Sequence, residues 1–189
     1  MRLFLLFFLV MMTFFNASAQ SSVKNVFKVG LIQPFYGTFQ LSYERFSSDT
    51  SFSFQVSGSI TKRELVMWEG LMADIFGNSI ELQGRYNFKE GFKYKFYCGV
   101  FFKYGQSKFS IDIPAGKIDI LEGNSKNIGV LIGYRFFFTK SRIYVDCSAG
   151  EGYHFADYSG RFSDKGRLIP SIISSGISPK LDLTVGIKF

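Results

Sequence analysis

The sequence is poor in the residues that build metal sites and disulfide scaffolds. Its 189 residues include one His, two Cys, one Trp and four Pro. These numbers are too small for a His/Cys zinc site or a small disulfide-stapled fold. No P-loop, dinucleotide fingerprint or cluster of metal ligands occurs in the sequence, so we expect no cofactor.

Long apolar runs are missing after residue 19, so no transmembrane helix of about 18 or more residues is expected. The one apolar run, Leu3–Phe15, follows Arg2 and precedes Ala17-Ser18-Ala19. This order is typical of a secretory signal peptide and its cleavage site. We therefore divide the chain into a signal peptide, residues 1–19, and one domain, residues 20–189. A membrane barrel remains compatible with this sequence, because strands of about 9–11 alternating residues can cross a bilayer.

Aromatic residues, in contrast, are abundant, with 24 Phe and 10 Tyr. Many fall in segments where apolar and polar residues alternate, which is typical of β-strands with two unlike faces. The C-terminus shows the pattern most clearly, because Leu181, Val185 and Phe189 share one face. Eight such segments are predicted, at about residues 25–32, 38–46, 51–60, 80–88, 92–104, 128–138, 142–155 and 180–189.

The predicted connections differ on the two sides of the sheet. Tight turns are expected at residues 47–50, 89–91 and 139–141, and long loops at about 61–78, 106–125 and 157–178, with one short connection at 33–37. Short turns at one rim and long loops at the other are typical of outer-membrane barrels. We therefore predict an all-β fold, an eight-stranded antiparallel up-and-down transmembrane β-barrel.

Alternation alone does not say which face points inward, since a soluble lipocalin-like barrel and a membrane barrel place the two faces oppositely. Two features favour the membrane barrel: the polar face is rich in small residues that suit a narrow interior, and aromatics gather at the strand ends. The short-turn belt is predicted to contain Phe46, Phe52, Phe88, Phe92, Phe136, Phe138 and Phe189, and the opposite belt Phe39, Tyr104, Tyr153 and Phe155.

The charged residues of the polar face are then expected to point into the lumen. Because both signs are present, we predict a paired network that fills the lumen. Its candidates are Lys28, Glu44, Glu81, Arg85, Lys95, Lys103, Arg135, Asp146, Lys180, Asp182 and Lys188. Cys98 and Cys147 fall on the outward face of two strands separated by a third, so we predict two free thiols.

Several segments resemble a known class of protein. Residues 180–189, which alternate and end in Phe189, resemble the C-terminal signal read by the outer-membrane barrel assembly machinery, with Val185, Ile187 and Phe189 as its apolar positions. Residues 37–45, 97–104 and 128–134 resemble strands of a small outer-membrane barrel family of unknown function from Bacteroidota. The resemblance implies an architecture like that of OmpX and the OmpA barrel, in the outer membrane.

Two kinds of surface site are predicted. Leu65, Trp68, Met72, Ile75 and Phe76 have helical spacing within residues 64–76, which suggests a short amphipathic helix at the barrel mouth that could bind a membrane or a partner. Basic residues could contact lipopolysaccharide phosphates or could simply be solvated. These are Lys62, Arg63, Arg161, Lys165 and Arg167.

The sequence gives little support for catalysis. Barrel enzymes that modify lipid A carry a His-x-Ser motif or a helix before the first strand, and His154 is followed by Phe155-Ala156. The favoured prediction is a non-enzymatic, monomeric outer-membrane barrel with a structural or surface-interaction role. Its expected partners are outer-membrane lipid, lipopolysaccharide and the assembly machinery, and nucleic acid is not expected because the positive charge is scattered. The alternatives are a lipid A-modifying enzyme, a narrow channel and a soluble lipocalin-like binder.

Overall fold

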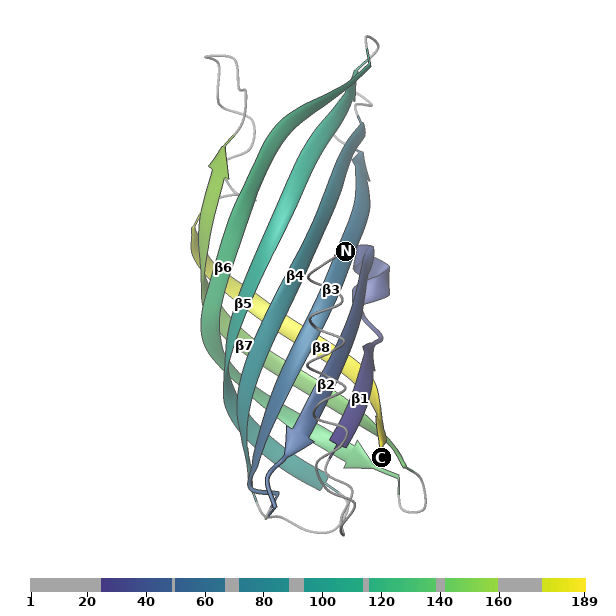
Figure 1. Ribbon diagram of the computed structural model, residues 1–189, viewed down its shortest axis with the longest axis vertical. Helices are drawn as coiled ribbons and strands as arrows, with labels where there is room; N and C mark the ends of the chain where they lie inside the picture. The colour runs from purple at the N-terminus through teal and green to yellow at the C-terminus, as the bar shows by residue number, and fades with distance from the viewer. Residues whose placement is uncertain are drawn as a thin grey trace, which may run out of the picture.

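The chain forms a closed barrel of eight antiparallel strands, seen in Figure 1. The computed structural model describes residues 25–48, 50–66, 72–88, 94–113, 116–138, 142–159 and 175–189. Each strand pairs with the next one in sequence, and β1 pairs with β8 to close the barrel. This confirms the predicted eight-stranded up-and-down topology. The predicted signal peptide, residues 1–19, lies outside the described residues.

The strands differ greatly in length. Those at the two ends of the chain are shorter than most of those between, and Figure 1 shows β3 to β6 rising beyond β1 and β2. The strands are β1 (Asn25–Gly30), β2 (Thr38–Phe46), β3 (Phe52–Val66), β4 (Met72–Asn87), β5 (Tyr94–Ile113), β6 (Gly116–Phe137), β7 (Ile143–Ser159) and β8 (Gly176–Lys188). A 3-10 helix, η1 (Gln33–Tyr36), joins β1 to β2 and ends at Gly37, whose φ of 68° is readily adopted only by glycine.

Two of the three predicted long loops are wrong, because most of their residues continue the strands. The β3–β4 ladder runs as far as the pair Val66–Met72, and the β5–β6 ladder as far as Ile113–Gly116. In β5 the alternation breaks at residues 105–107 and resumes in the other phase, with Phe109, Ile111 and Ile113 apolar, beside a register shift between Phe109 and Ser110. A break in the alternation ends the sequence signal, whereas the backbone hydrogen bonds that define a strand persist across it. The third predicted loop shortens at both ends, and its residues 160–174 lie outside the described part.

The apolar face of the barrel points outward. Side chains near the middle of the strands are well exposed, with Val100 at 60%, Val130 at 62% and Ile132 at 55%. Polar side chains on the opposite face are buried, including Arg135 at 0% and Gln83 at 0%. This confirms the predicted orientation, which is the reverse of that in a lipocalin-like barrel. No helix in the described part of the chain is long and apolar enough to cross a membrane.

The aromatic belts are confirmed except at one position. Outward-facing rings lie at the short-turn end, among them Phe52 and Phe138, and at the opposite end, among them Phe39 and Phe155. Phe46 was predicted in the short-turn belt, and this is wrong: it is 8% exposed and lies inside the barrel. Its position shares the inward parity of Glu44, two residues earlier on β2. Phe92 lies outside the described residues.

Candidate functional site

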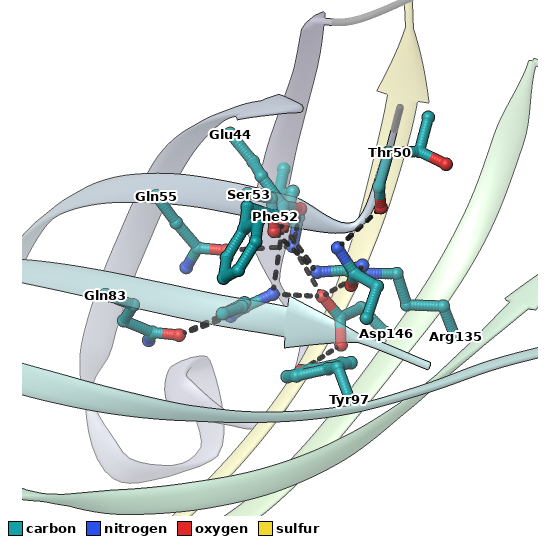
Figure 2. Close-up of polar contacts among 12 residues, drawn as sticks. Glu44, Thr50, Phe52, Ser53, Gln55, Gln83, Tyr97, Arg135 and Asp146 are labelled. Atoms are coloured by element: carbon teal, nitrogen blue, oxygen red, sulfur yellow. Dashed lines mark hydrogen bonds and ion pairs between the residues drawn. The ribbon is translucent and has the colours of Figure 1, made fainter. Parts of the chain in front are cut away.

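Five charged side chains from five strands meet inside the barrel near the short-turn end. Lys28 on β1, Glu44 on β2, Arg85 on β4, Arg135 on β6 and Asp146 on β7 are each at most 3% exposed. Each occupies an inward position of its strand, because its neighbours along the chain point outward. Figure 2 shows several of these side chains converging at the centre of the lumen. We call these five residues the lower cluster.

Every carboxylate of the lower cluster contacts more than one cation. Asp146 Oδ2 accepts hydrogen bonds from Lys28 Nζ and from Arg85 Nη1 at 2.8 Å. Glu44 Oε2 lies 2.6 Å from Lys28 Nζ, and Glu44 Oε1 accepts a hydrogen bond from Arg135 Nη2. Because buried charges are costly unless they are paired and hydrogen-bonded, these contacts allow the five groups to stay ionised.

Two tyrosines and a phenylalanine enclose the lower cluster. Tyr97 Oη donates to Asp146 Oδ1 at 2.5 Å, and its ring centre lies 4.3 Å from Arg135 Cζ and 4.7 Å from Arg85 Cζ. Tyr144 Oη donates to Glu44 Oε2 at 3.2 Å, and Arg135 Cζ lies 4.9 Å from the Phe46 ring centre. Rings beside guanidinium groups add cation–π attraction where water is excluded.

Gly133 provides the space for one of these rings. A Cβ atom at this position would lie 2.2 Å from Tyr97 Cζ. No other residue type fits there without moving the ring, so the glycine on β6 supports the tyrosine that binds Asp146.

Neutral side chains extend the network in both directions. Asn87 accepts a hydrogen bond from Arg135 and donates to the Thr50 carbonyl at 3.0 Å, which connects the network to the tight turn before β3 (Figure 2). Toward the other end, Gln83 Oε1 accepts from Arg85 Nε at 2.7 Å, and its amide donates to Glu81. Gln83 therefore connects the lower cluster to a second one.

The second cluster, which we call the upper cluster, consists of Glu81, Lys180 and Asp182. Lys180 Nζ lies 2.8 Å from both oxygens of Glu81 and 2.7 Å from Asp182 Oδ2. Gln33 of η1 donates to Asp182 Oδ1 at 2.9 Å, so the β1–β2 connection also contributes to this cluster.

The two clusters have opposite net charges. The lower cluster has three cations and two carboxylates, for a net charge of +1, and the upper cluster has one cation and two carboxylates, for −1. The connected network is therefore neutral overall, which confirms the predicted pairing. Apolar groups flank the charges: Val26, Phe46 and Tyr144 pack at the short-turn end, and Tyr97, Phe101 and Leu131 pack together farther in.

Tyr97 and Tyr144 were missed from the sequence as members of the network. Both sit at inward positions, two residues from Gly99 and Asp146 respectively. Their inward positions could have identified them, but an aromatic residue on the polar face could equally be expected only to fill space in the lumen. Lys103, predicted in the network, is exposed, and the side chain of Lys95 lies outside the described part.

The predicted interaction helix over residues 64–76 is wrong. Glu64, Leu65 and Val66 continue β3, and Met72, Ile75 and Phe76 belong to β4. The extended ladder satisfies the backbone groups across the hairpin, which the helical spacing of apolar residues did not reveal. Phe76 is 53% exposed. Trp68 and the side chains of Leu65 and Met72 lie outside the described part.

The predicted lipopolysaccharide contacts are only partly described. Lys62 and Arg63 are exposed on β3, and Arg161, Lys165 and Arg167 lie outside the described residues.

At the C-terminus, Val185, Ile187 and Phe189 belong to the outward face, and the Phe189 ring stacks on Phe27 of β1 at 5.2 Å between centroids. Cys98 and Cys147 are free, as predicted. Among the described residues, no group of three or more potential ligands is placed to hold a metal ion.

Comparison with known proteins gives a family and a fold. The model of a family described as "Protein of unknown function (DUF3575)" matches residues 3–167. The N-terminal β-barrel domain of OprF from Pseudomonas aeruginosa superposes with a TM-score of 0.50 at 16% identity, over 90% of this chain and 100% of that one. Neisserial surface protein A gives a TM-score of 0.48 at 17% identity, over 88% of this chain and 94% of that one. No curated protein sequence matches the chain.

Proposed function

The chain belongs to the DUF3575 family of proteins of unknown function, and we propose that it is a non-enzymatic integral outer-membrane barrel with a structural or surface-interaction role. The single observation that carries this proposal is the inverted distribution of its side chains. Large apolar groups cover the outside of the barrel, while ionised groups fill the inside. Such a surface is stable in hydrocarbon and costly in water.

The two rims support an assignment of sides. Short stretches of chain separate the strands at the end where both described termini lie, and tall hairpins stand at the other end (Figure 1). In outer-membrane barrels the short turns are periplasmic. We therefore place the β3–β4 and β5–β6 extensions outside the cell, where they offer polar surface to a partner. Lys62, on the outward face of β3, would lie there within reach of lipopolysaccharide phosphates, whereas Arg63 occupies an inward position.

The narrow-channel alternative predicts a continuous aqueous path, and the lumen provides an argument against it. The lower cluster, the upper cluster and the packed rings of Tyr97 and Phe101 occupy successive levels of the lumen of an eight-stranded barrel. Barrels of this size have interiors just wide enough for side chains to fill. We expect no steady conductance in planar bilayers, and reproducible single-channel steps would favour the channel instead.

The lipid A-modifying enzyme remains a second candidate only through His154. Its inward position on β7 directs it away from the acyl chains around the barrel, and Asp146, an inward acid on the same strand, is bound by Lys28, Arg85 and Tyr97. A His154→Ala variant should therefore leave the lipid A acylation pattern unchanged. A pattern that differs between wild type and variant would favour the enzyme.

Fractionation tests the proposed location. We expect the full chain to leave cell envelopes only with detergent and, when unheated, to migrate on a gel differently from the boiled protein, because a barrel resists unfolding by the gel detergent. Cleavage of the first 19 residues can be read from the mass of the extracted protein. Release into the aqueous fraction without detergent would contradict the proposal.

A further inference from the structure

Three hydrogen-bond donors lie in one row across neighbouring strands on the lumen side. Lys103 on β5 is directly opposite Asn127 on β6, and Asn127 is directly opposite His154 on β7. Neighbouring strands lie about 4.8 Å apart, so the outer two residues are about 10 Å apart with Asn127 between them. Side chains as long as lysine and histidine can converge over that distance on one small group.

The row lies where the closed wall of the barrel begins to open. His154 pairs with Gly176, the first residue of β8, whereas β5 and β6 continue well past Lys103 and Asn127. Lys103 is exposed and His154 is half-buried, so both can be reached from this end. Below the row, Phe101 and Leu131 close the lumen.

Lys103 has no counterion within the described part of the barrel. Glu81 faces it directly across the β4–β5 ladder, but both Glu81 oxygens lie 2.8 Å from Lys180 Nζ. Lys103 makes no hydrogen bond or ion pair with any described residue. The Lys103 ammonium group therefore lies at the mouth of the lumen without a partner among the described residues.

Asn127, the middle residue of the row, has a half-buried side chain. Its Oδ1 is buried without a hydrogen-bond partner in the described part of the chain. This oxygen lies against Gly152, where a Cβ atom would come within 2.3 Å of it. With the oxygen buried, the amide nitrogen is the accessible polar atom of this half-buried side chain, and it is a donor.

The inward face of this half of the barrel carries more cations than carboxylates. By strand alternation, the inward charged or titratable side chains at and beyond the row, among those described, are Lys103, His154, Arg63 and Glu81. Four exposed carboxylates lie on the outward face of the same strands, namely Glu64, Glu122, Glu151 and Asp157. An anion that approaches the mouth meets Lys103, His154 and Arg63 on the inner wall, and the Glu81 carboxylate at the row is already bound by Lys180.

We propose that the row Lys103–Asn127–His154 binds an oxyanion, a phosphate or carboxylate group, of a soluble molecule that enters from the open end. Lys103 supplies the charge, and the Asn127 amide and one imidazole N–H supply neutral donors, a combination suited to an anionic group with two or more oxygens. The row faces the lumen, so headgroups of lipids around the barrel do not reach it. This site adds a ligand to the proposed function and does not depend on whether the barrel has a surface partner.

The single histidine makes the test direct, because the imidazole signals in a nitrogen-15 NMR spectrum belong to His154 alone. The full protein, refolded in a maltoside detergent that carries neither phosphate nor carboxylate, is titrated at fixed pH and ionic strength by replacing chloride with inorganic phosphate or, separately, acetate. We expect a saturable shift with at least one of the two. Lys103→Gln should weaken that binding at least about tenfold, since it removes a charged hydrogen bond.

The matched control is Lys126→Gln, which removes an equal charge from the exposed outward position next to Asn127 and should leave the titration unchanged. Asn127→Ala, expected to weaken binding about fivefold, provides a second variant if Lys103→Gln does not refold. A shift with both salts would mean that the row binds oxyanions in general. A shift with one salt alone would identify the ligand group as a phosphate or as a carboxylate.

Three outcomes would overturn the site: no saturable shift, an equal response in Lys103→Gln, or an equal loss in Lys126→Gln. A fourth outcome would show that the bound oxyanion does not come from a soluble molecule. If His154 is already shifted in phosphatidylcholine nanodiscs without added salt, and Lys103→Gln removes that shift, a lipid phosphate occupies the row.

Discussion

Replacing Asp146 with asparagine removes one of the two negative charges of the lower cluster and leaves the shape of the side chain nearly unchanged. Asp146 is 3% exposed and accepts hydrogen bonds from Lys28, from Arg85 at 2.8 Å and from Tyr97 at 2.5 Å. In the variant, three buried cations would face the single carboxylate of Glu44. The substitution therefore leaves an additional unpaired positive charge buried in the lower cluster.

The expected cost is large because the cations cannot reach water. Breaking a buried ion pair by removing one partner typically costs about 3–5 kcal/mol in the free energy of unfolding. Each hydrogen bond to a charged group contributes roughly 1.5–3 kcal/mol to stability. The three hydrogen bonds to Asp146 can therefore account for this cost even if their contributions do not add up fully. We expect Asp146→Asn to lower the free energy of unfolding by about 3–5 kcal/mol.

The assay is urea unfolding of the barrel refolded in detergent micelles, with the folded fraction read from unheated gels. Glu151→Gln is the matched control, since Glu151 is an exposed carboxylate on the same strand, and it should not change the midpoint measurably. A Lys28→Met/Asp146→Asn double variant keeps the net charge of the lower cluster at +1 and should recover at least about 1 kcal/mol. If Asp146→Asn behaves like Glu151→Gln, the lumen is hydrated and our reasoning about the network is refuted.

Three further predictions follow from the packing. Gly133→Ala should destabilise the barrel by about 1–3 kcal/mol in the same urea assay, because its Cβ would overlap the ring of Tyr97 at 2.2 Å, whereas Gly58→Ala, with nothing within 4 Å, should be tolerated; equal effects would contradict the close fit. Gel mobility should be the same with and without reductant, since Cys98 and Cys147 are free, and a mobility change would reveal a disulfide. Phe189→Ala should reduce the amount of assembled barrel in cells but shift the urea midpoint of refolded protein only slightly; a loss confined to the refolded protein would argue against an assembly signal.

The number and order of the strands were predictable because each crossing strand is apolar on one face and polar on the other. The C-terminal segment is the clearest case: residues 180–189 alternate without interruption, and β8 spans Gly176–Lys188. The inward position of Arg135 and Asp146 followed from the same period of two. The extension of β5 was not predictable in this way, because the alternation breaks at residues 105–107 and resumes in the other phase at Phe109.

The candidate oxyanion site was even less predictable from the sequence. Lys103 and His154 were each recognisable at inward positions, but they are separated by 51 positions in the chain. Their alignment with Asn127 depends on the register of β5 with β6 and of β6 with β7. The pairing of Glu81 with Lys180, which leaves Lys103 without a partner among the described residues, depends on side chains from opposite walls of the lumen.

The sequence alone therefore determined which residues lie on each face, since alternation is a local property of every strand and the aromatic excess lies on the outward face. Tertiary structure decided which inward residues meet, because barrel closure and strand register bring together side chains from all parts of the chain. Lys28 and Asp146 are 118 positions apart and share a hydrogen bond. Such a contact exists only once eight strands have closed around a lumen too narrow for each charge to remain hydrated.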